Sequence, residues 1–188
     1  MTKTEIRKNI LQKRMNLTSE TIIQNSESIK LLLIKYFNFT NQNIHIYLPI
    51  IKKKEIDTFP IINFYKKNNC TIVLSKSNFR NSTLTNYIWD DYTELVENEY
   101  GILEPINGEE IKVNEIKIVL IPLLSFDIKG NRLGYGKGFY DRFLKQLPVD
   151  SIKIGLSHFE VQEALLPFDT HDIGLDYCVS PTKVYSFK

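Results

Sequence analysis

The chain has 188 residues, of which 43% are hydrophobic and 24% are charged, and its formal net charge is +2. This length supplies enough apolar material for one domain with a real core, so we expect a single domain over residues 1–188. The small net charge argues against a nucleic-acid partner. No apolar stretch approaches the length of a membrane span, and residues 1–15 are too charged for a secretory signal. We therefore expect a cytoplasmic protein, a monomer, without a nucleic-acid or membrane partner.

The two cysteines, Cys70 and Cys178, lie far apart inside hydrophobic runs. They match no metal-binding or redox spacing, so we expect two buried thiols.

The amino-terminal third of the sequence predicts two helices followed by an alternation of strands and helices. Thr2 and Glu5 have the spacing of a capping box, so a helix is expected to begin at Lys3. A second helix is expected to follow Thr18 and to end near Phe37. The next expected elements are a strand over 44–48, a helix capped by Asp57 or Thr58, and a strand over 70–74.

The pattern is weakest between residues 78 and 100, where 82–89 alternates like a strand and the charged segment 94–99 can form a helix. A turn and a loop are expected over 101–105. Further strands are expected over 118–121, 152–156 and 175–179. Strands that alternate with helices predict an α/β fold, with a mostly parallel sheet and helices on both faces. In such folds the ligand site lies at the carboxyl ends of the strands.

A glycine-rich stretch follows the strand expected at 118–121 and reads GNRLGYGKGFYDRFL from residue 130 to residue 144. Gly134, Gly136 and Gly138 alternate there, and glycine lets backbone N–H groups approach an anion. Arg132 and Lys137 supply the positive charge that an anion needs. The spacing fits neither the Walker pattern nor the dinucleotide-binding pattern. We interpret the stretch as a phosphate-binding loop of another class; the alternative is a mobile loop that the glycines merely turn.

Five ordered blocks of the sequence resemble the 5-formyltetrahydrofolate cyclo-ligase family, and together they extend over nearly the whole chain. The blocks are Lys3-x-x-x-Arg7, Tyr47-Leu48-Pro49 leading to Glu55-Ile56-Asp57-Thr58, GILEP over 101–105, PLLSFDIKGNRLGYGKGFYDRFL over 122–144, and Leu166-Pro167 with His171-Asp172 and Leu175-Asp176. The resemblance implies an ATP- and Mg²⁺-dependent conversion of 5-formyltetrahydrofolate to 5,10-methenyltetrahydrofolate, with release of ADP and phosphate. Two other functions stay open: a folate- or nucleotide-binding protein that has kept the pocket, and a kinase acting on another small molecule.

The resemblance also implies roles for individual residues. The nucleotide-binding set is Lys3, Arg7, Arg132, Gly134, Tyr135, Gly136, Lys137, Gly138, Phe139 and Tyr140. The substrate-binding set is Arg7, Leu48, Glu55, Tyr135, Phe139 and Trp89, where Trp89 has the alternative role of a core residue. Lys137, Arg132 and Glu55 are the implied catalytic residues.

Asp141 and Asp172 are the implied magnesium ligands. From the sequence alone Asp141 could equally be a first-turn helix residue, and Asp172 a turn residue. Phe139 stands where the family has a tyrosine, so one hydroxyl group of the family's pocket is missing here.

Overall fold

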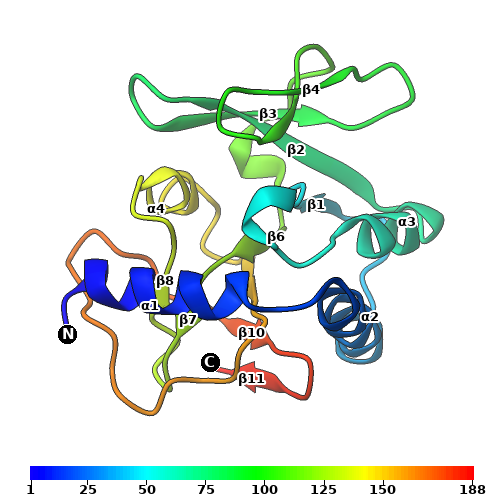
Figure 1. The fold of residues 1–188 in the computed structure, drawn as a ribbon. Coiled ribbons are helices and arrows are strands. Elements are labelled where there is room, and N and C mark those ends of the chain that lie inside the picture. Colours follow the sequence, from blue (N-terminus) through cyan, green and yellow to red (C-terminus); the bar gives the residue numbers. More distant parts are fainter.

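A seven-stranded sheet in the order β11-β10-β9-β6-β1-β2-β3 is the centre of the fold in the computed structural model, which describes all 188 residues (Figure 1). The five strands from β10 to β2 pair in parallel, whereas β3 and β11 pair antiparallel at the two edges. The strands are β1 (Asn43–His45), β2 (Thr71–Asn78), β3 (Thr83–Ile88), β6 (Ile118–Pro122), β9 (Ile152–Leu156), β10 (Tyr177–Val179) and β11 (Val184–Ser186). The expected mostly parallel α/β sheet is therefore confirmed.

Helices cover both faces of this sheet, as predicted (Figure 1). They are α1 (Lys3–Met15), α2 (Ser19–Tyr36), α3 (Phe59–Lys67) and α4 (Phe139–Leu144), with two 3₁₀ turns at Ile51–Lys53 and Val113–Glu115. Successive residues of β6 point to opposite faces, which divides the core in two. Leu120 packs with the side chains of α2 and α3, whereas Val119 packs with Phe143 of α4. No helix combines the length and the apolar character needed to cross a membrane.

The start of the chain folds as its sequence predicts. The Thr2 side chain accepts a hydrogen bond from the Glu5 amide, and Glu5 accepts one from the Thr2 amide, so the capping box is complete. The second helix begins after Thr18, which caps it through the amide of Thr21. Both cysteines are buried thiols, as expected.

The segment 94–99 is not a helix, and this prediction was wrong. Leu95–Glu97 forms strand β4, which pairs antiparallel with β5 (Leu103–Pro105). Gly101, at φ +75°, turns the chain between the two strands. The pairing gives the backbone of this charged segment a hydrogen-bonded ladder, and that tertiary contact outweighs the helical preference of its glutamates. Residues 103–105 are accordingly a strand and not a loop.

Several boundaries and short elements also differ from expectation. The first strand ends at His45, three residues early, and the last parallel strand begins at Tyr177, two residues late. A terminal hairpin strand, β11, was not predicted. Nor was the small hairpin of β7 (Ser125–Phe126) and β8 (Arg132–Leu133), which leads into the glycine-rich stretch. Two-residue strands carry too short a pattern to be recognised in a sequence.

Two buried histidines make the stability of this fold dependent on pH. His45 packs 4.7 Å from the ring of Phe143, and burial lowers its pKa to about 3. Burial, with a contribution from Arg14, lowers the pKa of His158 to about 4. The unfolded chain binds protons on both rings below about pH 6.5, and the folded protein does not. We therefore expect full stability above that pH and a loss of about 2 kcal/mol per histidine at pH 5.

Urea unfolding at pH 7 and pH 5 measures this loss directly. His45→Gln should remove about half of the pH-dependent part, and the exposed His171→Gln should leave it unchanged. Equal unfolding free energies of the wild type at the two pH values would contradict the assignment.

Candidate active site

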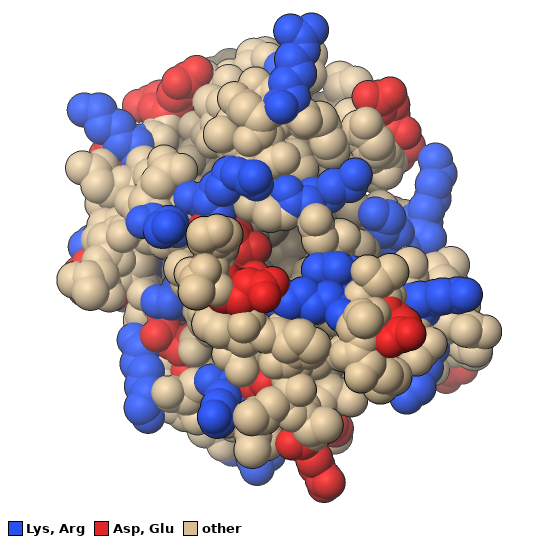
Figure 2. Space-filling view, turned by 90° about the vertical axis from the view of Figure 1, so that its left-hand side faces the viewer, with Lys and Arg blue, Asp and Glu red and all other residues tan.

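A cavity of about 320 Å³ opens at the carboxyl ends of the parallel strands, which is where the sequence predicted the ligand site. Tyr47 follows β1, Ser75 lies in the second half of β2, and Pro122 ends β6. The opposite wall comes from the strands β2 to β5 and includes Phe79 and Glu104. Lysine and arginine side chains gather around a hollow in this part of the surface (Figure 2). A second cleft continues from the cavity and shares part of its lining, namely Lys3, Arg7, Gly136, Gly138, Asp141 and Asp172.

The glycine-rich loop, residues 130–138, runs along one side of this cleft and packs against α1. Gly136 and Gly138 have φ angles of +87° and +71°, a region that favours glycine. A Cβ atom on Gly136 would lie 2.9 Å from Cζ of Arg7, so the guanidinium occupies the space that a side chain would need. The Nε of Arg7 donates a hydrogen bond of 3.0 Å to the carbonyl of Gly134. Gly134 itself has no positive φ, and a Cβ there would meet no atom within 4 Å.

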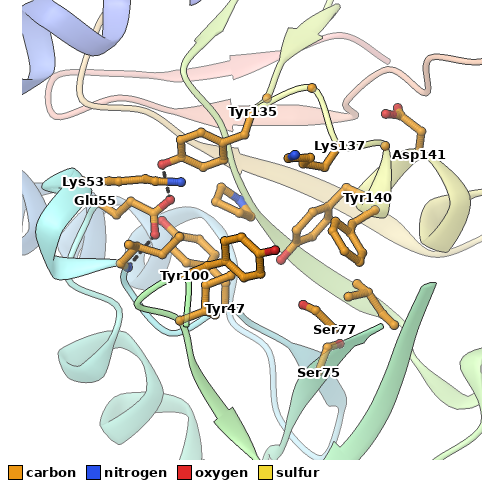
Figure 3. A pocket seen from close by; sticks show the side chains of 18 of the residues that line it. Tyr47, Lys53, Glu55, Ser75, Ser77, Tyr100, Tyr135, Lys137, Tyr140 and Asp141 are labelled. Carbon is orange, nitrogen blue, oxygen red and sulfur yellow. Dashed lines mark hydrogen bonds between the residues drawn. The ribbon is translucent and has the colours of Figure 1, made fainter. Parts of the chain in front are cut away.

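The cations that line the cavity differ in whether they already have a protein partner. Arg132 is nearly buried; it forms an ion pair of 2.8 Å with Oδ1 of Asp141 and also donates to the carbonyl of Ile173. Lys3 pairs with Asp172 and, at 2.7 Å, with Asp169. Lys137, by contrast, is exposed and has neither an ion pair nor a hydrogen bond from its ammonium group (Figure 3). It is therefore a cation free to bind an anion in the cavity.

The pKa values of the Lys3 pair show how strongly the two groups hold each other. Burial lowers the pKa of Lys3, but its hydrogen bonds to Asp169 and Asp172 outweigh this and raise the pKa overall. Burial raises the pKa of Asp172, but the hydrogen bond from the amide of Asp169 and the charge of Lys3 outweigh it. The pKa of this carboxyl group is therefore lowered overall. Both groups are thus charged near neutral pH.

Asp141 and Asp172 lie in the same cleft, and each keeps one carboxylate oxygen without a protein hydrogen bond. Asp141 uses only Oδ1, which accepts from Arg132 and from the amide of Ile173, and Asp172 uses only Oδ2. No group of three or more His, Cys, Asp or Glu side chains is arranged to hold a metal ion. Two carboxylates fit Mg²⁺ that arrives with phosphate oxygens, because Mg²⁺ often binds one or two carboxylates together with substrate phosphates and water.

Glu55 lies on the other side of the cavity and is 5% exposed. Its Oε2 accepts a hydrogen bond of 2.7 Å from the amide of Ile50, and its Oε1 accepts one from the hydroxyl of Tyr135 (Figure 3). Burial raises the pKa of Glu55, and these two hydrogen bonds together with the charges of Arg14 and Lys53 oppose the rise.

Tyrosine hydroxyls give this part of the cavity its polar character. The hydroxyls of Tyr47 and Tyr140 have no hydrogen-bond partner within the protein, although both residues line the cavity. Burial raises the pKa of each, and the charge of Glu55 adds to the rise, so both hydroxyls are neutral. They can donate to or accept from a bound ligand.

The structure brings together every predicted site residue except one. The residues that line the cavity are Lys3, Arg7, Leu48, Glu55, Arg132, Gly134, Tyr135, Gly136, Lys137, Gly138, Phe139, Tyr140, Asp141 and Asp172. Trp89 does not line the cavity, so the structure gives no support for its assignment to the substrate pocket. Strand β3 runs antiparallel to β2, so its last residue, Ile88, pairs with Val73 and lies away from the carboxyl ends. The Trp89 ring packs against Phe59 and, at 4.3 Å, under the ammonium of Lys66.

Two residues at the site were missed: Lys53, which lines the cavity, and Arg14, which contacts Tyr135 but does not itself line the cavity. Arg14 is two turns beyond Arg7 on α1, and this i, i+7 spacing could have shown that the two share a helix face. The run Lys52-Lys53-Lys54 reads in the sequence as a solvated loop, but the ammonium of Lys53 lies 4.2 Å from the ring centre of Tyr135. Lys54 donates to the carbonyls of Met15 and Leu17, so of the three lysines only Lys52 is exposed; its side chain is 79% exposed and forms an ion pair of 3.4 Å with Glu97 at the surface.

The sheet and the cleft together define an α/β protein with a cationic ligand site at the carboxyl ends of its strands. Residues 1–181 match the 5-formyltetrahydrofolate cyclo-ligase family. The chain is 30% identical over 182 residues to the 5-formyltetrahydrofolate cyclo-ligase of Mycoplasma pneumoniae, covering 96% of this chain and 99% of that one. It is 31% identical over 139 residues to the enzyme of the same name from Escherichia coli, covering 71% and 75%.

Solved structures agree with the sequence matches. The NMR structure of Aquifex aeolicus 5,10-methenyltetrahydrofolate synthetase superimposes with a TM-score of 0.85 at 32% identity, covering 100% of this chain and 94% of the other. The 5,10-methenyltetrahydrofolate synthetase from M. pneumoniae gives a TM-score of 0.74 at 26% identity, with 96% and 99% covered. The chain belongs to the 5-formyltetrahydrofolate cyclo-ligase family.

Proposed function

We propose that this protein closes the ring of 5-formyltetrahydrofolate to 5,10-methenyltetrahydrofolate with consumption of ATP. One observation carries the proposal: the cavity and the cleft that continues from it are open to each other and have two different ends. One end has Lys137, which has no protein partner, and glycines with positive φ; the other has the buried carboxylate of Glu55 with several tyrosines. A nucleotide triphosphate suits the first end. A flat, polar heterocycle such as a reduced pterin suits the second. Membership of the family supports both assignments.

The chemistry explains why the two ends belong to one site. A formamide carbonyl is a poor electrophile, and its oxygen is a poor leaving group. Transfer of the γ-phosphoryl group of ATP to the formyl oxygen makes that oxygen a leaving group. N10 of the folate then attacks the formyl carbon, phosphate departs with its oxygen, and the proton of N10 is released. The protein contributes positioning and neutralisation of charge, as in phosphoryl transfer generally.

At the nucleotide end, we assign the phosphate oxygens to Lys137, Arg132 and Arg7, and to the backbone amides of the glycine-rich loop. Lys137 is the cation without a protein partner, so it gives up no ion pair when it binds phosphate. Arg132 is held by Asp141, and Arg7 by the carbonyl of Gly134, so both guanidinium groups are oriented before the nucleotide binds. Such preorganised donors are the largest source of stabilisation for developing charge.

At the substrate end, we assign Glu55 as the acceptor for an N–H group of the folate and the rings of Phe139 and Tyr140 as aromatic walls. Both oxygens of Glu55 have lone pairs beyond the hydrogen bonds they already accept. Leu48 adds apolar contact next to Glu55.

Asp141 and Asp172 are the residues that we expect to hold Mg²⁺ through their unused oxygens. The ion would neutralise phosphate charge and orient the triphosphate. Asp141 also holds Arg132, so the same carboxylate orients a cation of the loop.

Incubation of the purified protein with 5-formyltetrahydrofolate, ATP and Mg²⁺ tests the proposal. We expect a near-ultraviolet absorbance of the methenyl product, with one ADP released per product. Release of ADP without folate would indicate a kinase acting on another acceptor. Calorimetric binding of both ligands without product, by folded protein, would indicate a binding protein and would overturn the proposed activity.

A further inference from the structure

Arg14 is a buried cation with no carboxylate in direct contact. It lies in the last turn of α1 and is 3% exposed. One guanidinium nitrogen donates to the carbonyl of Leu123 at 3.4 Å, another donates to the hydroxyl of Tyr135, and Nε has no partner. A buried charge with only neutral partners is costly, and an apolar side chain would fill the same space at lower cost. The presence of an arginine therefore calls for an explanation other than stability.

Arg14 reaches the carboxylate of Glu55 through Tyr135. The Tyr135 hydroxyl accepts the hydrogen bond from Arg14 and donates its own proton to Oε1 of Glu55. A hydroxyl that accepts from a cation becomes a stronger donor, because hydrogen bonds in a chain polarise one another. The ring of Tyr135 is also held in place, with the Lys53 ammonium 4.2 Å and the Arg14 guanidinium 5.4 Å from its centre.

Tyr135 connects this chain of hydrogen bonds to the glycine-rich loop. Its backbone lies between Gly134 and Gly136, whereas its side chain points away from the loop toward Glu55 (Figure 3). A residue of the loop that we assign to the nucleotide thus holds the carboxylate that we assign to the folate.

We propose that Arg14 is a positioning residue which acts through the Tyr135 hydroxyl to orient the Glu55 carboxylate and to keep it ionised for the substrate. The role of Glu55 toward folate rests on the function proposed above, whereas the effect of Arg14 on Glu55 does not.

The groups that face Glu55 come from several elements. Arg14 is on α1, Lys53 in the 3₁₀ turn, Tyr47 after β1, Tyr135 after β8, and Tyr140 in α4. His158 is also close, since it shares Arg14 as a neighbour and lies against the carbonyl of Lys54. The three tyrosines and this histidine are neutral near pH 7, so Arg14 and Lys53 are the charges that favour an ionised Glu55.

The proposal predicts a change in the titration of Glu55 when either member of the relay is removed. Arg14→Met and Tyr135→Phe each take away support for the charged carboxylate, so the pKa of Glu55 should rise in both. The measurement is a ¹³C NMR titration of the glutamate carboxyl carbons, with the Glu55 resonance identified by its absence in Glu55→Gln. At pH 7 we expect kcat/KM for the folate to fall about tenfold in each variant.

The double variant separates action through Tyr135 from independent effects. If Arg14 acts through the hydroxyl, the shift in the double variant is smaller than the sum of the two single shifts. Lys13→Met removes an exposed cation from the same turn of α1 and should leave the titration unchanged. Additive shifts, or an unchanged Glu55 titration in folded Tyr135→Phe, would overturn the proposal.

The titration needs no turnover and therefore distinguishes two failures. Absence of methenyl product in the wild type would reject the proposed activity while leaving the Arg14 relay testable. If Arg14→Met does not fold, the titration of Glu55 in Tyr135→Phe is the deciding measurement. This variant removes one oxygen atom and leaves the ring between its two cations.

Discussion

Replacement of Lys137 by methionine is expected to lower the turnover number about 10²–10³-fold, a range measured for the loss of one preorganised donor to a developing negative charge. Lys137 is exposed and makes no ion pair or hydrogen bond through its ammonium group, so the unfolding free energy should stay within about 0.5 kcal/mol of the wild type. Steady-state kinetics with Mg·ATP and 5-formyltetrahydrofolate measures the first quantity, and urea unfolding measures the second.

Lys129→Met is the matched control, because Lys129 is also exposed but lies in the β7–β8 hairpin outside the cleft. It should have wild-type turnover. A Lys137→Met enzyme as fast as this control would show that the free ammonium does not bind the transferred phosphoryl group.

Replacement of Gly136 by alanine is expected to weaken nucleotide binding by tenfold or more. The left-handed conformation costs a non-glycine residue about 1–2 kcal/mol. In addition, the new Cβ would lie 2.9 Å from Cζ of Arg7, so the guanidinium would have to leave its hydrogen bond with the carbonyl of Gly134. Calorimetry with a non-hydrolysable ATP analogue and Mg²⁺ gives the affinity of the variant.

Gly134→Ala is the comparison within the same loop. Gly134 has no positive φ, and its Cβ would meet open space within 4 Å, so alanine should weaken nucleotide binding less there than at Gly136. An equal loss at the two positions would mean that loop flexibility, and not the packing of Arg7, governs nucleotide affinity.

The fold could be predicted from the sequence wherever a hydrophobic pattern extended over several turns or a whole strand. The pattern Ile118-Val119-Leu120-Ile121 predicts a strand buried on both faces, and β6 is that strand at the centre of the sheet. The prediction for Leu95–Glu97 failed because the structure of this segment depends on a partner strand about eight residues along the chain. Local composition contains no information about that partner. The sequence predicted which helices and strands exist better than it predicted the residues at which they begin and end.

The residues of the site also differ in how far the sequence could predict them. Residues in contiguous motifs, such as 132–141, could be assigned from the sequence together with the family resemblance, and the cavity contains all of them. Arg14 and Lys53 lie outside these motifs. The i, i+7 spacing of Arg7 and Arg14 indicates a shared helix face, but only the folded chain creates the contacts of Arg14 and Lys53 with Tyr135. Trp89 lies outside the cavity because β3 runs antiparallel to β2 and ends at the other edge of the sheet, and the alternation of residues 82–89 contains no information about the strand with which it pairs.

The pairing of the second half of β2 determines how freely the sequence of one cavity wall can change during evolution. Beyond Val73 this strand pairs only with β3, whereas residues 71–73 pair with β1 in the parallel sheet. Insertions or substitutions in Ser75–Asn78 and in the strands that follow would therefore leave every ladder of the five parallel strands intact. Evolution can thus change ligand selectivity on that side without altering the side that we assign to phosphate, and we expect differences in substrate preference between related enzymes to concentrate there.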